Sequence, residues 1–179
     1  KYIVENGGED HPNAKVKFKL GDVVTTVIQC ANGQTIMLSH DTNSPRPYSL
    51  NFRVQGTQGL WMKDNKSIYI EGRSPQSHRW ESDEAYMEEF DHPLWKKYED
   101  QASGAGHGGM DFFVVRAFVE SLRGDQNPVI DVYDAVSMSV IVPLSEKSIK
   151  LNSASVKIPD FTRGKWKTNQ PIFGLDDRY

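Results

Sequence analysis

One histidine stands in a run of very small residues, where its side chain could meet a ligand. His107 lies within residues 104–109, and the five other residues of this run are Gly or Ala. An imidazole titrates near neutral pH, so it suits proton transfer to and from a reacting oxygen. A glycine-rich run could present it on a mobile loop. His107 is therefore a candidate acid/base, and the alternative is a surface loop whose histidine has no chemical role.

A second candidate is a stiff segment that follows an apolar run. Pro45 and Pro47 enclose Arg46, and Tyr48 follows directly. Proline fixes its own φ and restricts the residue before it, so this segment could hold Arg46 and Tyr48 rigidly toward a ligand. The alternative is a stiff connection with an exposed arginine.

Other chemistries lack a matching pattern. The remaining histidines have no spacing to another His, Cys or carboxylate that is typical of a metal site, so we expect no metal. The single cysteine, Cys30, lies in an apolar run, and no Gly-x-Ser-x-Gly segment occurs, which leaves a nucleophilic triad without a candidate. The Gly-x-Gly-x-x-Gly spacing in residues 104–109 follows a polar helical stretch rather than a strand. We therefore expect no dinucleotide fold and no cofactor-binding residue in this chain.

The first half of the chain is predicted to hold these residues on strands. Residues 23–30 and 35–41 are rich in β-branched and apolar types, and the Asn-Gly between them favours a hairpin turn. Further short strands are predicted within 49–55, 58–63 and 67–71, separated by glycine, aspartate and asparagine. This half is expected to be an antiparallel meander.

The second half is predicted to be helical. Helix starts are expected after Asp83, at Pro93, at Met110 and after Asp131, with the helix from 110 ending at Gly124 and the last one kinked by Pro143. A last strand is expected at 155–158, followed by an irregular arm. Strands followed by helices predict an α+β fold, an open, mainly antiparallel sheet with helices packed on one face.

Composition limits the partners of the chain. Its 179 residues are 37% hydrophobic and 25% charged, which is typical of one globular unit. The formal net charge of −3 gives no sign of a nucleic-acid partner, and a neutral or weakly charged ligand fits better. No apolar run approaches the roughly 20 residues that a membrane span needs.

Four segments, in order, resemble the C-terminal domain of glycoside hydrolase family 109, a branch of the Gfo/Idh/MocA oxidoreductase superfamily. They are residues 34–49, 106–112, 131–135 and 158–166. The resemblance implies a two-domain parent enzyme, in which an N-terminal Rossmann domain, absent here, holds NAD. Residues 1–179 would be the C-terminal substrate-binding and oligomerisation domain, with its start trimmed. The fragment alone is expected to be inactive, and the parent is expected to be exported and to form homo-oligomers through its sheet.

The resemblance also implies an activity. Members of the family resemble α-N-acetylgalactosaminidases that use NAD without consuming it: C3 of the sugar is oxidised transiently, the aglycone is eliminated, water adds and hydride returns. The substrate would be a carbohydrate. The family's histidine loop matches His107 as the acid/base, and its Pro-Arg-Pro-Tyr segment matches Arg46 and Tyr48 as sugar contacts. Ala105 departs from the family's usual glycine.

Two other functions stay open. The parent could be a sugar dehydrogenase of the same superfamily that releases NADH. The chain could also be a non-catalytic carbohydrate-binding or oligomerisation module. A proton-transfer group at His107 argues against the second reading, because binding alone does not require one.

Overall fold

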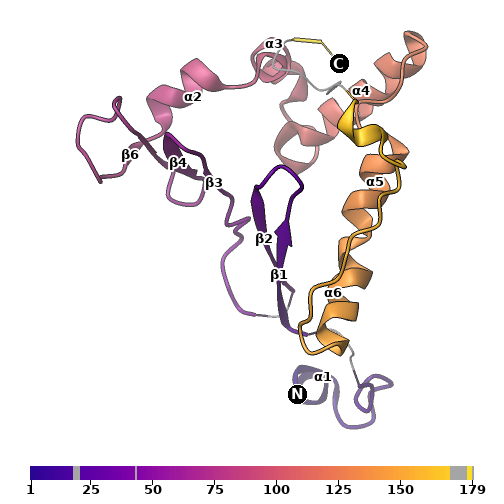
Figure 1. The fold of residues 1–179 in the computed structure, drawn as a ribbon. Coiled ribbons are helices and arrows are strands. Elements are labelled where there is room, and N and C mark those ends of the chain that lie inside the picture. Colours follow the sequence, from indigo (N-terminus) through magenta and orange to yellow (C-terminus); the bar gives the residue numbers. More distant parts are fainter. Residues whose placement is uncertain (18–20, 43, 170–176, 179) are drawn as a thin grey trace. The chain divides into compact units, whose positions relative to one another are not determined.

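A computed structural model describes residues 1–17, 21–42, 44–169 and 177–178 of the chain. Its contacts group the chain in two compact units, Lys1–Ser49 and Leu50–Tyr179 (Figure 1). The expectation of one substrate domain over the whole chain stays a prediction.

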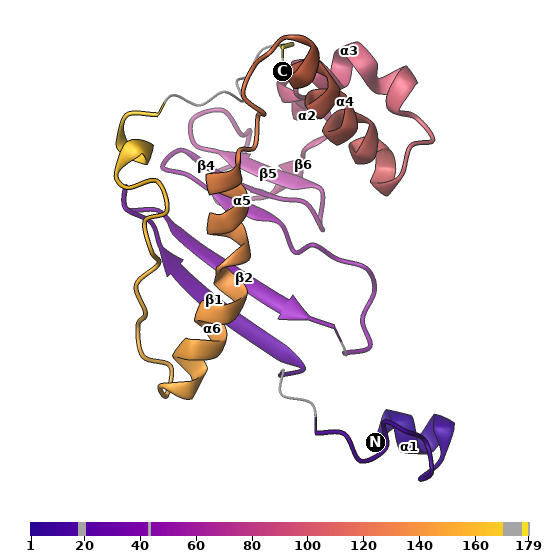
Figure 2. The same ribbon diagram turned by 90° about the vertical axis from the view of Figure 1, so that its right-hand side faces the viewer.

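The first unit is a short helix and a hairpin. Helix α1 covers Tyr2–Gly7, in a segment where the sequence predicted no element. Strands β1 (Val23–Gln29) and β2 (Thr35–Asp41) pair antiparallel along their whole length, and Figure 2 shows them as a two-stranded ribbon. Gly33 in the turn has a φ of 94°, a conformation that glycine adopts without strain. The predicted hairpin is confirmed.

The second unit begins with a four-stranded antiparallel sheet. Strands β3 (Arg53–Gln55), β4 (Gly59–Met62), β5 (Ser67–Ile70) and β6 (Glu81–Ser82) follow one another in space as they do in sequence. The predicted meander is therefore confirmed, with strands shorter than the apolar runs suggested.

Helix α2 (Glu84–Phe90) makes polar contacts with β6 and with the segment between β5 and β6. The hydroxyl of Tyr86 donates to the carboxylate of Glu81 in β6 at 2.9 Å. The Arg73 guanidinium lies 4.8 Å from the centre of the Tyr86 ring and pairs with Glu89, and this hydrogen bond lowers the pKa of the Glu89 carboxyl. Tyr86 is one of the few buried large side chains.

Two helices form the next layer. Helix α3 (Pro93–Ala102) starts at the predicted proline, and α4 (Met110–Arg123) starts and ends where its apolar spacing predicted. They pack through aromatic rings: the centres of Trp95 and Phe113 lie 5.2 Å apart. This contact joins the first turn of α3 to the first turn of α4.

Helices α5 (Val132–Ser139) and α6 (Ile141–Lys150) are the last α-helices in the described part of the chain. The Asp131 carboxylate caps α5 and accepts from the amides of Tyr133 at 2.8 Å and Asp134 at 2.9 Å, as predicted. The break before α6 falls three residues ahead of Pro143, because proline has no N–H to donate to the carbonyl four residues back. Figure 1 shows the two helices running in nearly the same direction.

The predicted last strand at 155–158 is wrong. These residues are irregular, and in the described part of the chain they have no partner strand to supply ladder hydrogen bonds. The arm beyond them contains a short 3-10 helix, Lys165–Lys167.

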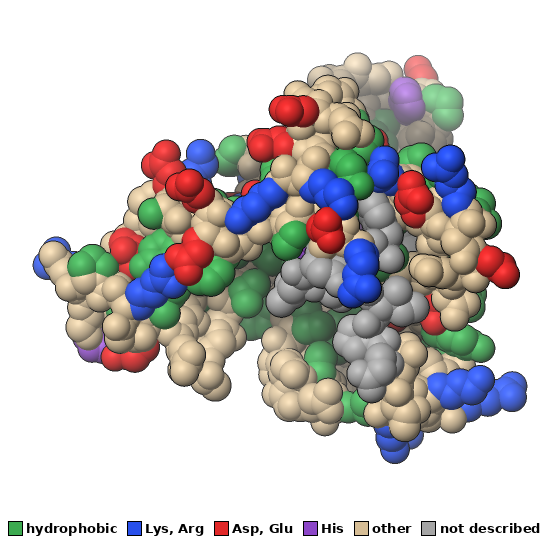
Figure 3. All heavy atoms as spheres, turned by 90° about the horizontal axis from the view of Figure 1, so that it is seen from above, with side chains coloured by type: hydrophobic (Ala, Val, Ile, Leu, Met, Phe, Trp, Pro, Cys, Tyr) green, Lys and Arg blue, Asp and Glu red, His purple; other side chains and the backbone are tan. Residues whose placement is uncertain are grey.

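The α+β class with open antiparallel sheets is confirmed, although the strands form two sheets rather than one. No helix among the described residues is long and apolar enough to cross a bilayer. On the face drawn in Figure 3, basic and acidic side chains are interspersed rather than gathered by sign.

Candidate active site

The glycine-rich run forms an ordered turn between α3 and α4. The amide of Ala105 donates to the carbonyl of Ala102 at 3.0 Å, and the amide of Gly109 donates to Gly106 at 3.2 Å. Residues His107–Gly109 make a single 3-10 turn. The turn is tied to the end of α3 by backbone hydrogen bonds, and the mobility of the loop stays a prediction.

Three consecutive residues of this turn have left-handed backbone conformations. The φ angles are 53° at His107, 68° at Gly108 and 98° at Gly109. A Cβ on residue 109 would also come within 3.0 Å of Cη2 of Trp95. Glycine at 109 thus permits both the conformation and the close approach of the indole.

The His107 imidazole is presented to solvent and is held by one partner. Its side chain is 84% exposed, and Nδ1 lies 2.9 and 3.0 Å from the two carboxylate oxygens of Asp111. The sequence reasoning missed Asp111 as a site residue. Its spacing of four residues from His107 is no helical signal, because His107 precedes α4 and residues 107–109 have left-handed backbones.

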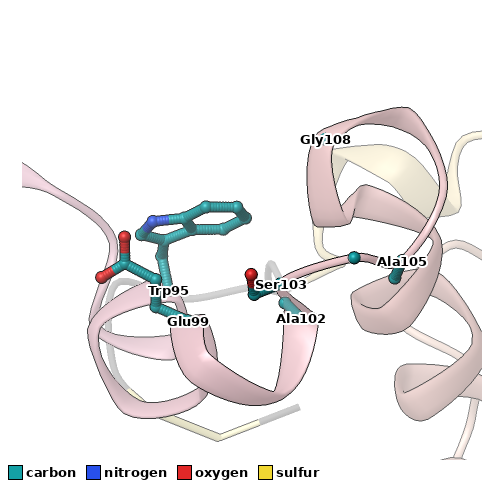
Figure 4. Close-up of a pocket in the computed structure, with 7 residues that line it drawn as sticks. Trp95, Glu99, Ala102, Ser103, Ala105 and Gly108 are labelled. Atoms are coloured by element: carbon teal, nitrogen blue, oxygen red, sulfur yellow. The ribbon is translucent and has the colours of Figure 1, made fainter.

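A hollow lies beside this turn. It has a volume of about 410 Å³, within the range of small-ligand sites. Figure 4 shows the indole of Trp95 on one side, with the carboxylate of Glu99 and the hydroxyl of Ser103 nearby. The lining residues are Trp95, Glu99, Ala102, Ser103, Gly104, Ala105 and Gly108. Ala105, which stands where the resemblance implies a glycine, is thus one of the lining residues.

The Arg46 side chain makes its polar contacts within its own segment, residues 41–49. Its guanidinium donates to the carbonyls of Asp41 and Ser49, each at 3.1 Å, and Nε lies 3.3 Å from the Asp41 carboxylate. Tyr48 is 90% exposed. Both residues belong to the first unit and His107 belongs to the second. The joint role of the three predicted site residues therefore stays a prediction.

The described residues do not fit the pyrophosphate of NAD. The Gly-x-Gly-x-x-Gly spacing follows α3 instead of a strand. The Asp111 carboxylate occupies the first turn of α4, where a phosphate would need free amide donors and no negative charge. No group of three or more potential metal ligands gathers among the described residues.

Fold and site thus define an α+β domain with an exposed histidine–carboxylate pair beside a hollow, and comparison with known proteins gives its family. Residues 1–168 match the family model described as "Glycosyl hydrolase 109, C-terminal domain". The chain belongs to glycosyl hydrolase family 109, as its resemblance predicted.

Relatives match nearly the whole chain. A glycosyl hydrolase family 109 protein of Stenotrophomonas maltophilia (strain K279a) is 56% identical over 99% of this chain and 39% of its own length. An alpha-N-acetylgalactosaminidase of Tannerella forsythia is 49% identical over 97% of this chain and 37% of its own. One of Shewanella oneidensis is 40% identical over 91% and 36%. The chain spans less than two fifths of the length of these relatives.

Proposed function

We propose that this chain is the substrate-side domain of an NAD-dependent exo-glycosidase that releases α-linked N-acetylgalactosamine. The observation that carries the proposal is His107, an exposed imidazole held by a carboxylate in the same turn as Ala105 and Gly108, which line the hollow. Membership of the family and the names of the Tannerella and Shewanella relatives support the substrate class.

His107 would act as the acid/base toward the glycosidic oxygen. As the bond from the sugar carbon breaks, its electron pair stays on the leaving oxygen, which takes a proton from Nε2 of the imidazolium. The neutral imidazole then takes a proton from water as hydroxide adds to the sugar carbon. The exposure of the ring leaves Nε2 open to both oxygens, because Nδ1 is the nitrogen that faces Asp111.

NAD would supply the hydride chemistry at the sugar ring when bound. We assign it to another part of the parent protein, because the residues of this chain do not fit its pyrophosphate. Arg46 and Tyr48 are proposed as sugar contacts, with Arg46 fixing the shape of the segment that carries the exposed Tyr48 ring. Export and homo-oligomers formed through the sheet remain part of the proposal.

The test uses the purified parent protein with p-nitrophenyl α-N-acetylgalactosaminide. We expect many turnovers without added NAD and no accumulation of NADH, measured by absorbance. Stoichiometric NADH release with no sugar cleavage would establish the dehydrogenase alternative instead. Sugar binding with neither reaction would identify a carbohydrate-binding module.

A further inference from the structure

We propose that Asp111 is the positioning residue of His107, fixing its tautomer and ring orientation. The inference rests on the proposed acid/base role of His107. An ionised carboxylate can only accept hydrogen bonds, so Nδ1 of His107 must be the donor. With 2.9 and 3.0 Å to the two oxygens, the proton on Nδ1 is shared by the whole carboxylate.

This hydrogen bond determines which ring nitrogen of His107 transfers protons. A neutral imidazole carries one N–H, and with that hydrogen on Nδ1 the lone pair lies on Nε2. Nε2 can then give a proton to the leaving oxygen and take one back from water without any rearrangement of the ring. The opposite tautomer would place a hydrogen on Nε2 and leave it unable to accept from water.

The contact between His107 and Asp111 depends on the absence of a side chain at Gly106. A Cβ on residue 106 would lie 2.2 Å from Oδ2 of Asp111, which is closer than the two atoms can approach. The backbone of Gly106 has a φ of −56°, a value open to any residue. Glycine is therefore required at 106 for the carboxylate and not for the conformation of the chain.

Two substitutions disturb the contact between His107 and Asp111 while they keep His107 itself. Asp111→Asn keeps the shape of the side chain but offers an amide that can donate to Nδ1. Gly106→Ala retains both His107 and Asp111 and pushes the flexible carboxylate aside. The matched controls are Asp134→Asn, which also removes a carboxylate from the first turn of a helix, and Gly56→Ala, where a Cβ meets nothing within 4 Å.

The first readout is the tautomer of neutral His107 in the parent protein, from ¹⁵N chemical shifts of labelled imidazole. His107 is identified by the loss of its signals in His107→Asn. We expect Nδ1–H in the unmodified protein and in both controls, and a shift toward Nε2–H in Asp111→Asn and Gly106→Ala. The same tautomer in all five proteins would overturn the proposal.

The second readout is turnover of an unactivated glycoside. We expect Asp111→Asn and Gly106→Ala to lower kcat by about 10- to 100-fold, with KM changed by less than about threefold, the usual effect of removing a partner that orients a metal-bound histidine. A changed tautomer with unchanged kcat would overturn the positioning role. If the unmodified parent cleaves no glycoside, the proposed function fails, while the tautomer measurement still decides whether Asp111 fixes His107.

Discussion

The indole nitrogen of Trp61 donates a hydrogen bond of 2.8 Å to the carboxylate of Asp83. Trp61 lies in β4 and Asp83 directly precedes α2, so one bond ties the middle of the four-stranded sheet to the helix that follows it. Asp83 is only 8% exposed, although it is charged. A buried polar group of this kind is retained where it has a partner.

Replacing Asp83 by alanine should therefore destabilise the second unit. The Trp61 N–H would lose its acceptor, and leaving a buried donor unpaired costs about 1–3 kcal/mol. Asp83→Asn, which keeps an acceptor, should cost less. Thermal unfolding of the parent protein measures the difference, with the exposed Asp100→Ala as control. Equal melting temperatures for all four proteins would contradict the structural role of this bond.

His107→Asn is the variant that tests the acid/base with the least disturbance of the backbone. Asparagine tolerates the left-handed conformation that residue 107 adopts. Turnover of unactivated glycosides should fall by about 10²- to 10⁴-fold, the usual contribution of a positioned acid/base. Activated aryl glycosides should lose less, because their leaving oxygen needs little protonation.

The matched control for this variant is His78→Asn. His78 is also an exposed histidine in the second unit, with a φ of 58°. It should keep full activity and the same melting temperature as His107→Asn. Retention of activity by His107→Asn on an unactivated substrate would remove His107 from the mechanism.

Arg46→Ala should weaken substrate binding more than it slows turnover at saturation. Steady-state kinetics should show KM raised by about tenfold and kcat nearly unchanged, because a sugar contact is made throughout the reaction. Arg46→Lys separates charge from geometry, since an ammonium cannot reproduce the planar fork that reaches the carbonyls of Asp41 and Ser49. The exposed Arg79→Ala is the control. A lower kcat at unchanged KM would exclude the binding role.

The stability of the turn that follows Asp160 should depend on pH. The hydroxyl and amide of Thr162 and the amide of Gly164 all donate to the Asp160 carboxylate. The Thr162 hydroxyl bond is the main cause that lowers the pKa of Asp160, with the two amides adding to it. Because the folded pKa lies below the unfolded value, the stabilisation is complete above about pH 4 and is lost as the pH falls through the folded pKa.

A ¹³C titration of the carboxyl group and amide exchange at Gly164 would follow this change. We expect the carboxyl to titrate below its ordinary range, and the protection of the Gly164 amide, taken relative to its intrinsic exchange rate at each pH, to fall as it does so. Asp160→Asn should abolish this pH dependence of the protection. An ordinary Asp160 pKa would show that these three donors do not stabilise the carboxylate.

Calorimetric titration of the 179-residue chain with NAD should show no binding at micromolar concentrations. The dinucleotide needs a strand-to-helix glycine turn with free amide donors, and here the turn joins two helices and faces a carboxylate. Micromolar affinity would contradict the assignment of NAD to another part of the parent. AMP is a suitable second ligand to separate adenine binding from pyrophosphate binding.

The elements that sequence predicted correctly are those defined by local chemistry. The Asp131 cap, the start of α3 at Pro93 and the hairpin turn each depend on residues within a few positions of one another. The false strand at 155–158 shows the opposite case, because a strand exists only through a neighbour that its own residues do not specify.

The candidate site divides in the same way. His107 could be singled out from its neighbours. Its contact with Asp111 could not be predicted, because it depends on the left-handed turn between the two residues. The function of Gly106 could not be predicted from the sequence either, since its closeness to the Asp111 carboxylate follows from the left-handed turn between them. Whether Arg46 and His107 meet depends on contacts far apart in the chain, which local patterns do not encode.

The β1–β2 ribbon has a practical consequence for anyone who handles this chain. Within the described residues each of its strands pairs with the other alone, so each has an outer edge with no neighbouring strand. Val27, Ile36 and Met37 add exposed apolar side chains to the ribbon. Such edges are templates for further strands, so concentrated stocks of the chain should form fibrils over storage, and lysine substitutions at these three positions should lengthen its shelf life.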